Sequence, residues 1–379
     1  MATPDTLDFA KLTAPIAGEA PTGADLRTAL GTPAAAKYQQ LALLRKQATS
    51  FERDGGADAL QNAATAWRTI RGLAEELLAT ATKDLQVCAW FIESLLRERG
   101  FAGLRDGLRL ARELVAKYWE QLHPAPEPGE PASARVEPLC GLNGIDAAGT
   151  LITPIGLVPV TKPGNDGAFT AYDWTNANTP YRGNTGDANF AQKNTQREQA
   201  NAEAQKKIRA AVAASGAPFY VALRDDLEAT LVQLAALEKE IDPRCGGDAL
   251  PTSSIRNAVT AVQGAVLSLA KELLPAPPAP AAAAPAAGAA TEGGAPAAAP
   301  AKPAPPPGAI ATRADALATL KKVAEFFRTT EPHSPLSYML EQVVRYGGLT
   351  LPELLAELLP DKNAREALFT RTGIQPPAK

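Results

Sequence analysis

The sequence predicts an all-α protein with a helical amino-terminal domain, a second helical domain, a disordered linker and a small helical carboxy-terminal domain. Apolar residues recur at spacings of three and four along most of the chain, which places them on one face of a helix. Turn-forming residues concentrate in a single segment, and another stretch consists almost entirely of proline, alanine and glycine. These observations favour packed helices over a parallel sheet.

The composition is that of a globular protein and excludes several classes of function. The 379 residues include 45% hydrophobic side chains, enough for ordinary buried cores. The formal net charge of −3, without a dense basic stripe, argues against nucleic-acid binding. We see no signal peptide and no long uncharged apolar run, so we expect a cytoplasmic protein without direct membrane insertion.

The amino-terminal domain is predicted over residues 1–140. Trp67, Ile70, Ala74 and Leu77 follow helical spacing and should line one buried face. The next helix, TKDLQVCAWFIESLLRERG, is expected to be capped by Thr82, largely buried, and to end at Gly100. A third helix should end before Pro124, since proline disfavours helical geometry in the preceding residue.

Residues 141–190 lose this periodicity. Gly, Asn, Asp and Pro separate short β-branched pieces such as TLITPIGLVPVT, which predicts an irregular connector with room for a small hairpin. The NDG triplet in this segment lacks the alternating carboxylates of a calcium loop and is better interpreted as a turn.

Helices resume in a middle domain predicted over residues 191–274. Its last helix carries a regular apolar seam that suits a partner helix lying nearly along it. Packing within the subunit against the preceding helix is one interpretation, and a homodimer through the seam is the other. The seam residues are Ile255, Val259, Val262, Val266 and Leu269.

Residues 275–308 form the predicted linker, because their proline-alanine composition favours extended polyproline II and cannot bury a core. Residues 309–379 follow as short, well-capped helices, with Thr350 and Glu353 forming one capping box. Such a small unit buries little surface alone, so we expect it to oligomerise. The residues predicted for this contact are Phe327, Pro335, Leu336, Tyr338, Leu340, Val343 and Leu354.

Catalytic chemistry has few candidates. The chain has two histidines. His123, with Glu120 one turn before it, stands at a helix end where a structural role suffices, and Ser334 beside His333 suits a helix cap better than a nucleophile. Three widely separated cysteines lack metal-site spacing, and no phosphate-binding loop is present. We therefore predict no catalytic, cofactor or metal site, with a hydrolase using His333 and Ser334 as the remaining enzymatic alternative.

Several motifs resemble a known family. K-D-L-Q from Lys83, G-F-A-G-L-R-D-G-L from Gly100 and Y-W-E-Q-L-H-P from Tyr118 occur in this order, and PIAGEAPTGADLR precedes them. They are similar to the amino-terminal ImpA domain of the TssA family of the bacterial type VI secretion system. The tail IATRADALATLKKVAEFFRTTEPHSPLSYMLEQ resembles the short carboxy-terminal domain of one branch of that family. The motif residues carried over are Lys83, Asp84, Leu85, Gly103, Leu104, Gly107, Leu108, Tyr118, Trp119, His123 and Pro124.

The resemblance implies a non-enzymatic scaffold. Members of the family bind baseplate, membrane-complex and tail tube or sheath components and help to prime or coordinate assembly of the contractile tail. It also implies a carboxy-terminal ring, a middle domain able to dimerise, no cofactor, and a location on the apparatus at the inner face of the inner membrane. A general cytoplasmic helical adaptor unrelated to secretion is the alternative function.

Overall fold

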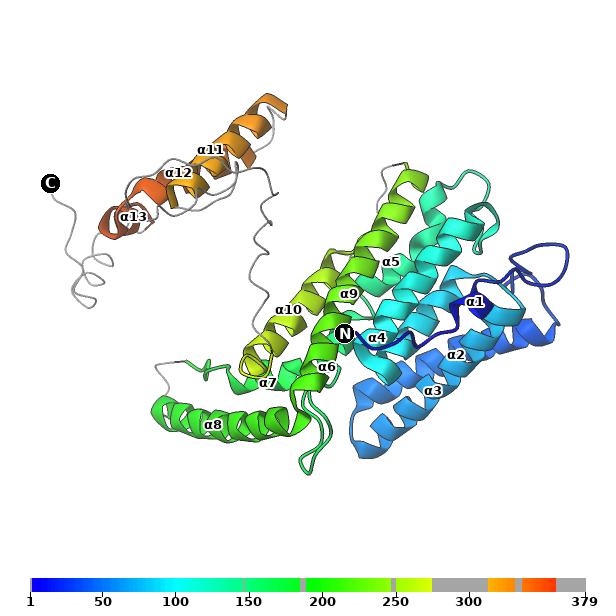
Figure 1. Cartoon of the computed structure of the whole chain (residues 1–379), viewed down its shortest axis with the longest axis horizontal. Coiled ribbons are helices and arrows are strands. Elements are labelled where there is room, and N and C mark those ends of the chain that lie inside the picture. The colour runs from blue at the N-terminus through cyan, green and yellow to red at the C-terminus, as the bar shows by residue number, and fades with distance from the viewer. Residues whose placement is uncertain are drawn as a thin grey trace, which may run out of the picture. The chain divides into compact units, whose positions relative to one another are not determined.

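The computed structural model describes residues 2–145, 147–184, 189–246, 250–274, 313–330 and 336–358. The chain divides into two compact units, Met1–Ala281 and Ala282–Lys379, and the helices of both appear in Figure 1. Within the described ranges, β structure is limited to four isolated bridges, which confirms the all-α prediction. The linker predicted at residues 275–308 lies outside the described residues.

The first unit opens with a short helix, α1 (Phe9–Leu12), and a pair of long helices, α2 (Pro33–Asp54) and α3 (Ala57–Thr80). Thr32 caps α2, with its hydroxyl accepting from the Ala35 N–H at 3.1 Å. In α3, the predicted apolar face is fully buried, and Trp67 is 1% exposed. The 3.6-residue period was therefore sufficient to identify the core face of this helix.

The central element is α4 (Leu85–Tyr118), which reverses direction at Gly100. This residue has φ 58° and ψ −141°, a conformation available to glycine without a Cβ penalty. A Cβ on Gly103 would lie 2.3 Å from the carbonyl oxygen of Leu95, and one on Gly107 would lie 2.8 Å from Ile92 Cγ1. Gly103 thus faces Leu95, and Gly107, further along the second arm, faces Ile92, which is earlier on the first arm. The two arms therefore run antiparallel, and α4 is a tight helical hairpin.

The cap of this hairpin differs from the prediction. The side chain of Asp84, and not that of Thr82, accepts from the first-turn N–H groups of Gln86 and Val87, at 2.6 and 3.2 Å. Thr82 instead donates its hydroxyl proton to the carbonyl of Ala24 at 2.8 Å. Thr82 is thus engaged by the amino-terminal segment, and the acidic residue two positions later takes the cap.

The connector between residues 141 and 190 is only partly irregular. It follows α5 (Glu137–Asn143) and contains the short helices α6 (Ile152–Leu157) and α7 (Ala171–Ala177). The β-branched piece TLITPIGLVPVT, part of the segment predicted to be irregular, contains α6, where Leu151 and Ile155 are both buried next to α10 (Ser253–Leu269). A small hairpin does occur just after it, where Pro159 bridges Thr170 and Gly164 bridges Gly167.

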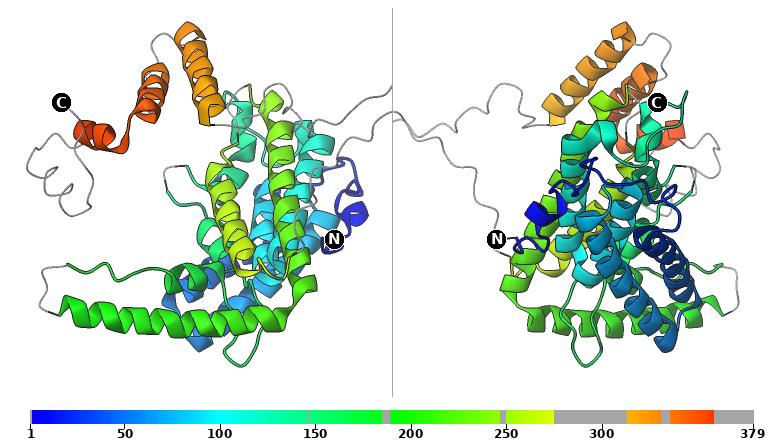
Figure 2. Two further views of the ribbon diagram at one scale, coloured as in Figure 1. Left: turned by 60° about the vertical axis from the view of Figure 1, so that its left-hand side comes forward. Right: turned by 90° about the vertical axis from the view of Figure 1, so that its right-hand side faces the viewer.

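Three helices complete the unit: α8 (Phe190–Ser215), α9 (Ala217–Ile241) and α10. In Figure 2, α8 runs across the direction of α9 and α10 and leaves most of its length exposed. The predicted seam on α10 is buried within the unit, with Val259 and Val266 both 0% exposed, against α9, α6, α7 and α5. Packing within the subunit therefore accounts for the seam, and a homodimer through it would require these side chains to leave the core.

A buried charge network joins α9 to the first 140 residues. Arg105 on α4 donates to Asp106 at 2.7 Å and to Asp226 on α9 at 2.9 Å. The backbone N–H and the hydroxyl of Thr3 donate to the same Asp226 carboxylate, at 2.9 and 2.5 Å. Thr230, one turn further along α9, donates to the carbonyl of Phe101. Residues on either side of the boundary predicted at 140 thus belong to one packed unit.

The second unit contains α11 (Arg313–Thr330), α12 (Leu336–Gly348) and α13 (Leu351–Leu358). The α12 helix ends at the pair Gly347–Gly348, and Glu353 caps α13, as predicted, by accepting from the N–H and hydroxyl of Thr350 at 2.8 and 2.7 Å. Large apolar side chains remain exposed on α11 and α12, among them Phe326 at 60% and Met339 at 60%. Among the side chains described in this unit, Ala324 is buried, whereas the large apolar ones are half-buried or exposed.

Of the three cysteines, Cys88 and Cys245 are buried and Cys140 is half-buried. Burial raises the pKa of the Cys88 thiol far above its ordinary value. Burial, helped by the charge of Glu137, raises the pKa of Cys140 to about 11.

We expect the native chain at pH 8 to react with a disulfide reagent at least about a hundredfold more slowly than the denatured chain, since the thiolate is the reactive species. The reaction is followed by absorbance of the released thiol, and the same chain in guanidinium serves as the control. A native thiol that reacts at the denatured rate would contradict this description of the cysteines.

Candidate functional site

Two of the family motifs, those of Lys83 and His123, meet where the two ends of α4 lie together. Lys83 is fully buried, and its ammonium group donates to the carbonyls of Leu12 at 2.8 Å and Leu78 at 2.6 Å, near the carboxy-terminal ends of α1 and α3. Its pKa is lowered to about 8, first by burial and then by the nearby charge of Lys117. Lys83 therefore joins three helices through carbonyl groups that would otherwise lack partners.

His123 completes the same junction. Its N–H donates to the carbonyl of Lys83 at 3.0 Å, and its carbonyl accepts from Leu85 at 2.8 Å. The ring Nε2 lies 3.2 Å from the carbonyl oxygen of Gly23, whereas Nδ1 is buried without a hydrogen-bond partner in the described chain. His123 is thus held by backbone groups and not by Glu120, which is exposed.

The remaining motif residues support the hairpin itself. Leu85, Leu104 and Leu108 are buried in its core, and Gly103 and Gly107 permit the close approach of its arms. Tyr118 donates its hydroxyl proton to the carbonyl of Thr13 at 2.9 Å, and Trp119 begins the 3-10 turn η1 (Trp119–Gln121) that leads to the cis His123–Pro124 bond. These residues build the scaffold beside a surface groove.

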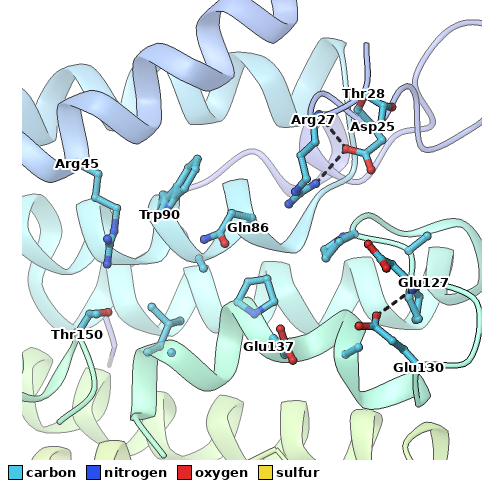
Figure 3. Close-up of a pocket in the computed structure, with 18 of the residues that line it drawn as sticks. Asp25, Arg27, Thr28, Arg45, Gln86, Trp90, Glu127, Glu130, Glu137 and Thr150 are labelled. Carbon is cyan, nitrogen blue, oxygen red and sulfur yellow. Dashed lines mark hydrogen bonds and ion pairs between the residues drawn. The ribbon is translucent and has the colours of Figure 1, made fainter. Parts of the chain in front are cut away.

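This groove, called the α4 groove below, has a volume of about 860 Å³. Its floor is one stripe of the first arm of α4, formed by Gln86, Ala89, Trp90 and Glu93 at positions i, i+3, i+4 and i+7. One wall comes from residues 25–28 and α2, and the other from residues 124–142 (Figure 3). The amide of Gln86 lies in the middle of the groove in the same view.

The two arginines in the groove are neutralised by acidic partners. Arg27 makes two hydrogen bonds to Asp84, at 2.6 and 3.2 Å, and one to Asp25 at 3.1 Å. Arg45 pairs with the buried carboxylate of Glu93 at 2.5 and 2.8 Å, and this pair raises the pKa of Arg45 despite its partial burial. Both guanidinium groups are therefore fixed as charged parts of the wall.

The pKa of Asp25 follows from the same contacts. Partial burial opposes ionisation, but the backbone N–H and guanidinium of Arg27 donate to the carboxylate and lower its pKa below the ordinary value. Tyr38, which lies behind Trp90 with a ring-centroid separation of 5.2 Å, has its pKa raised to about 12 by burial. Neither group titrates near neutral pH.

The opposite wall carries acidic residues without cationic partners. Glu127, Glu130 and Glu137 are exposed and line the groove, and none of them pairs with a basic side chain in the described ranges. Pro124, Pro126 and Pro138 stand among them and restrict the backbone. The oxygen of the Thr150 hydroxyl is buried at the end of this wall with no hydrogen-bond partner.

Charged, polar and aromatic side chains line the groove. In the described part of the chain, no cluster of three or more His, Cys, Asp or Glu side chains is arranged to hold a metal ion. Its lining contains carboxylates, guanidinium groups, an amide and an indole, but no histidine, cysteine or lysine. The predicted enzymatic alternative, His333 with Ser334, lies outside the described residues.

Sequence reasoning identified the junction but missed the groove. Pro124 was among the motif residues and lines the groove, and Asp84 holds Arg27 from beneath it, whereas Arg27, Arg45, Gln86, Trp90 and Glu93 were not singled out. A signal was present, because Gln86, Trp90 and Glu93 form a semi-polar stripe at helical spacing within a helix predicted to be mostly buried.

Comparisons with known proteins identify the region that contains the junction and most of the groove. A family model described as ImpA, N-terminal, type VI secretion system matches residues 13–144. Over 370 residues, the chain is 29% identical to the type VI secretion system component TssA1 of Pseudomonas aeruginosa, with 94% of this chain and 96% of the relative covered. The chain is similar to a TssA component along almost its whole length, and residues 13–144 match the ImpA amino-terminal region.

A solved TssA structure shares the fold of the first unit. It is the N-terminal domain, including the conserved ImpA_N region, of the TssA component of the type VI secretion system from Burkholderia cenocepacia. Its TM-score is 0.54 at 25% identity, and the match covers 70% of this chain and 94% of that chain. The likeness therefore extends beyond residue 144, in agreement with the packing of α9 against α4.

No helix in the described ranges of the chain is both long enough and apolar enough to cross a bilayer.

Proposed function

We propose that this chain is a non-enzymatic scaffold of a type VI secretion system that self-associates through its second unit and binds other secretion proteins through its first. The observation that carries the proposal is the match to TssA1 along almost the whole of both chains. A groove with fixed charges and no reaction centre suits such a role. The partners proposed are baseplate, membrane-complex and tail tube or sheath proteins, on the apparatus at the inner face of the inner membrane.

Self-association through the second unit is supported by its exposed apolar side chains. Tyr338 and Val343 are 65% and 50% exposed on α12, while Phe327, Leu340 and Leu354 are half-buried. Pro335 lies outside the described residues, and Leu336 begins α12. Covering these side chains with another copy of the chain removes apolar surface from water and favours a closed oligomer such as a ring.

Replacing Tyr338, Met339 and Val343 together with serine is expected to reduce the oligomer to smaller species, since all three side chains are at least half exposed in the single chain. Light scattering after size exclusion measures the mass of the full-length chain. Replacement of the exposed Lys321 and Lys322 with serine is the matched control. An unchanged mass in the apolar variant would contradict self-association through α12.

The cellular role is tested by deleting the gene and following fluorescent sheath assembly and export of the tail-tube protein. We expect both to fail, and both to return with the wild-type chain but not with a chain ending at residue 281. A general adaptor unrelated to secretion would leave tube export intact. A chain ending at 281 that restored export would contradict the need for the second unit.

A further inference from the structure

We infer that the α4 groove is a docking site for an extended segment of a partner protein that carries at least one arginine or lysine. This inference rests on the proposed scaffold function and specifies the chemistry of one of its partners. Four features of the groove carry it: its size, its unbalanced charge, the unpaired polar groups of its floor and the rigidity of its walls.

The volume of the groove is far larger than a single bound ion requires. About 860 Å³ lies in the upper part of the range found for ligand sites, and it is bounded by three separate parts of the chain. In Figure 3, Asp25, Arg27 and Thr28 lie on one side of the groove, and Glu127, Glu130 and Glu137 lie on the other. A segment of several residues fits this space, with its side chains reaching both walls.

The charges that line the groove favour a ligand of positive charge. Arg27 is paired with Asp84 and Asp25, and Arg45 is paired with Glu93, so neither is available to an anion without losing its partner. Glu127, Glu130 and Glu137 have no such compensation in the described chain. A basic side chain entering the groove therefore meets negative charge that is not neutralised within the protein.

The floor provides both stacking and hydrogen bonding. Trp90 is half-buried and is supported from behind by Tyr38, so its ring is a fixed surface against which a guanidinium or ammonium group can pack. Its indole N–H and the Gln86 side-chain amide have no hydrogen-bond partner in the described residues. An amide offers one acceptor and two donors, which suits the main chain of an extended peptide.

The walls are already in place for binding. The bidentate pairs of Arg27 and Arg45 fix one wall, and the prolines at 124, 126 and 138 restrict the other. A site that needs little ordering loses less conformational entropy when a ligand binds. This is the property expected of a surface built to receive a mobile segment.

The test uses the full-length chain and an array of 15-residue peptides tiling the secretion proteins encoded beside its gene. Peptides retained on the array are measured by fluorescence anisotropy. We expect binders to contain arginine or lysine, to lose at least about tenfold in affinity when these residues are replaced with glutamine, and to weaken as salt rises. If no array peptide binds, or if binders are indifferent to that replacement, the inference is overturned.

Two variants locate the binding in the groove. Trp90→Ala removes the stacking surface, and a triple change of Glu127, Glu130 and Glu137 to glutamine removes the unpaired charge from exposed positions without loss of packing. Each should weaken binding at least about tenfold. The matched control replaces Glu19, Glu203 and Glu228, also exposed and outside the groove, with glutamine and should bind normally. Equal affinities for the two triple variants would place the peptide elsewhere and refute the assignment.

The outcomes separate this inference from the proposed function. Failure of the array or of the groove variants leaves the gene-deletion result untouched, so the scaffold role would stand without this docking site. Normal export of the tail-tube protein after gene deletion would contradict the proposed scaffold function, regardless of what binds in the groove.

Discussion

Replacing Gly103 with alanine is expected to lower the free energy of unfolding of the first unit by about 3 kcal/mol or more. The added Cβ would lie 2.3 Å from the carbonyl oxygen of Leu95, 2.8 Å from its carbonyl carbon and 2.9 Å from Cβ of Arg99. Backbone atoms cannot move aside as a flexible side chain would, so the two arms of α4 must separate. Since α3 and α9 both pack on α4, the separation is expected to loosen the whole unit.

The measurement is urea unfolding followed by tryptophan fluorescence. All four tryptophans lie in the first unit, so the signal reports on that unit alone. Gly72→Ala and Gly264→Ala are matched controls, because both glycines are helical and an added Cβ meets nothing within 4 Å. These should be neutral or stabilising by up to about 1 kcal/mol. A Gly103→Ala chain as stable as the controls would show that the arms are further apart than described.

Replacing Lys83 with methionine is expected to cost about 2–4 kcal/mol. Methionine has nearly the same length but no donor, so the carbonyls of Leu12 and Leu78 lose their bonds to the ammonium group while remaining inside the unit. Relief of the desolvation that lowers the pKa of Lys83 offsets part of this loss. The cost of leaving two helix-end carbonyls unpaired exceeds that gain, so the net effect is destabilising.

The same unfolding experiment tests the prediction, with Lys37→Met as its control. Lys37 forms an exposed ion pair with Glu76 at 2.5 Å, and such pairs contribute little. We expect the control to remain within about 1 kcal/mol of the original chain. If Lys83→Met and Lys37→Met had equal effects, Lys83 would not be the group that joins α1, α3 and α4.

Local patterns predicted the helices of this protein more reliably than their connections. The spacing around Trp67 and the break at Gly100 were sufficient because a buried helix face and a positive φ each follow from a few neighbouring residues. The Thr82 cap was wrong, since Ala24 accepts from the same hydroxyl in the folded chain. The connector around residue 151 is less irregular than predicted, because contact with α10 favours a helical turn there.

The groove was less accessible to sequence reasoning than the motif residues that support it. Its floor lies on a single helix, so the stripe from Gln86 to Glu93 was visible in principle. Its walls were not, because Arg27 and Glu137 approach this stripe from distant parts of the chain. Whether an arginine is free or already paired with a carboxylate is likewise a property of the folded contacts.

Residue type and spacing were enough to predict the helical class, the apolar seam on α10, the break at Gly100 and the resemblance to the TssA family. Each of these depends on a few turns of chain, which local geometry converts directly into structure. The folded contacts were needed to learn that the α10 seam is internal, that α9 shares a core with α4 through Arg105 and Asp226, and that the arginines of the groove are already neutralised. Burial and charge pairing depend on which residues, distant in the sequence, come into contact, and these contacts are determined by the packing of the whole unit.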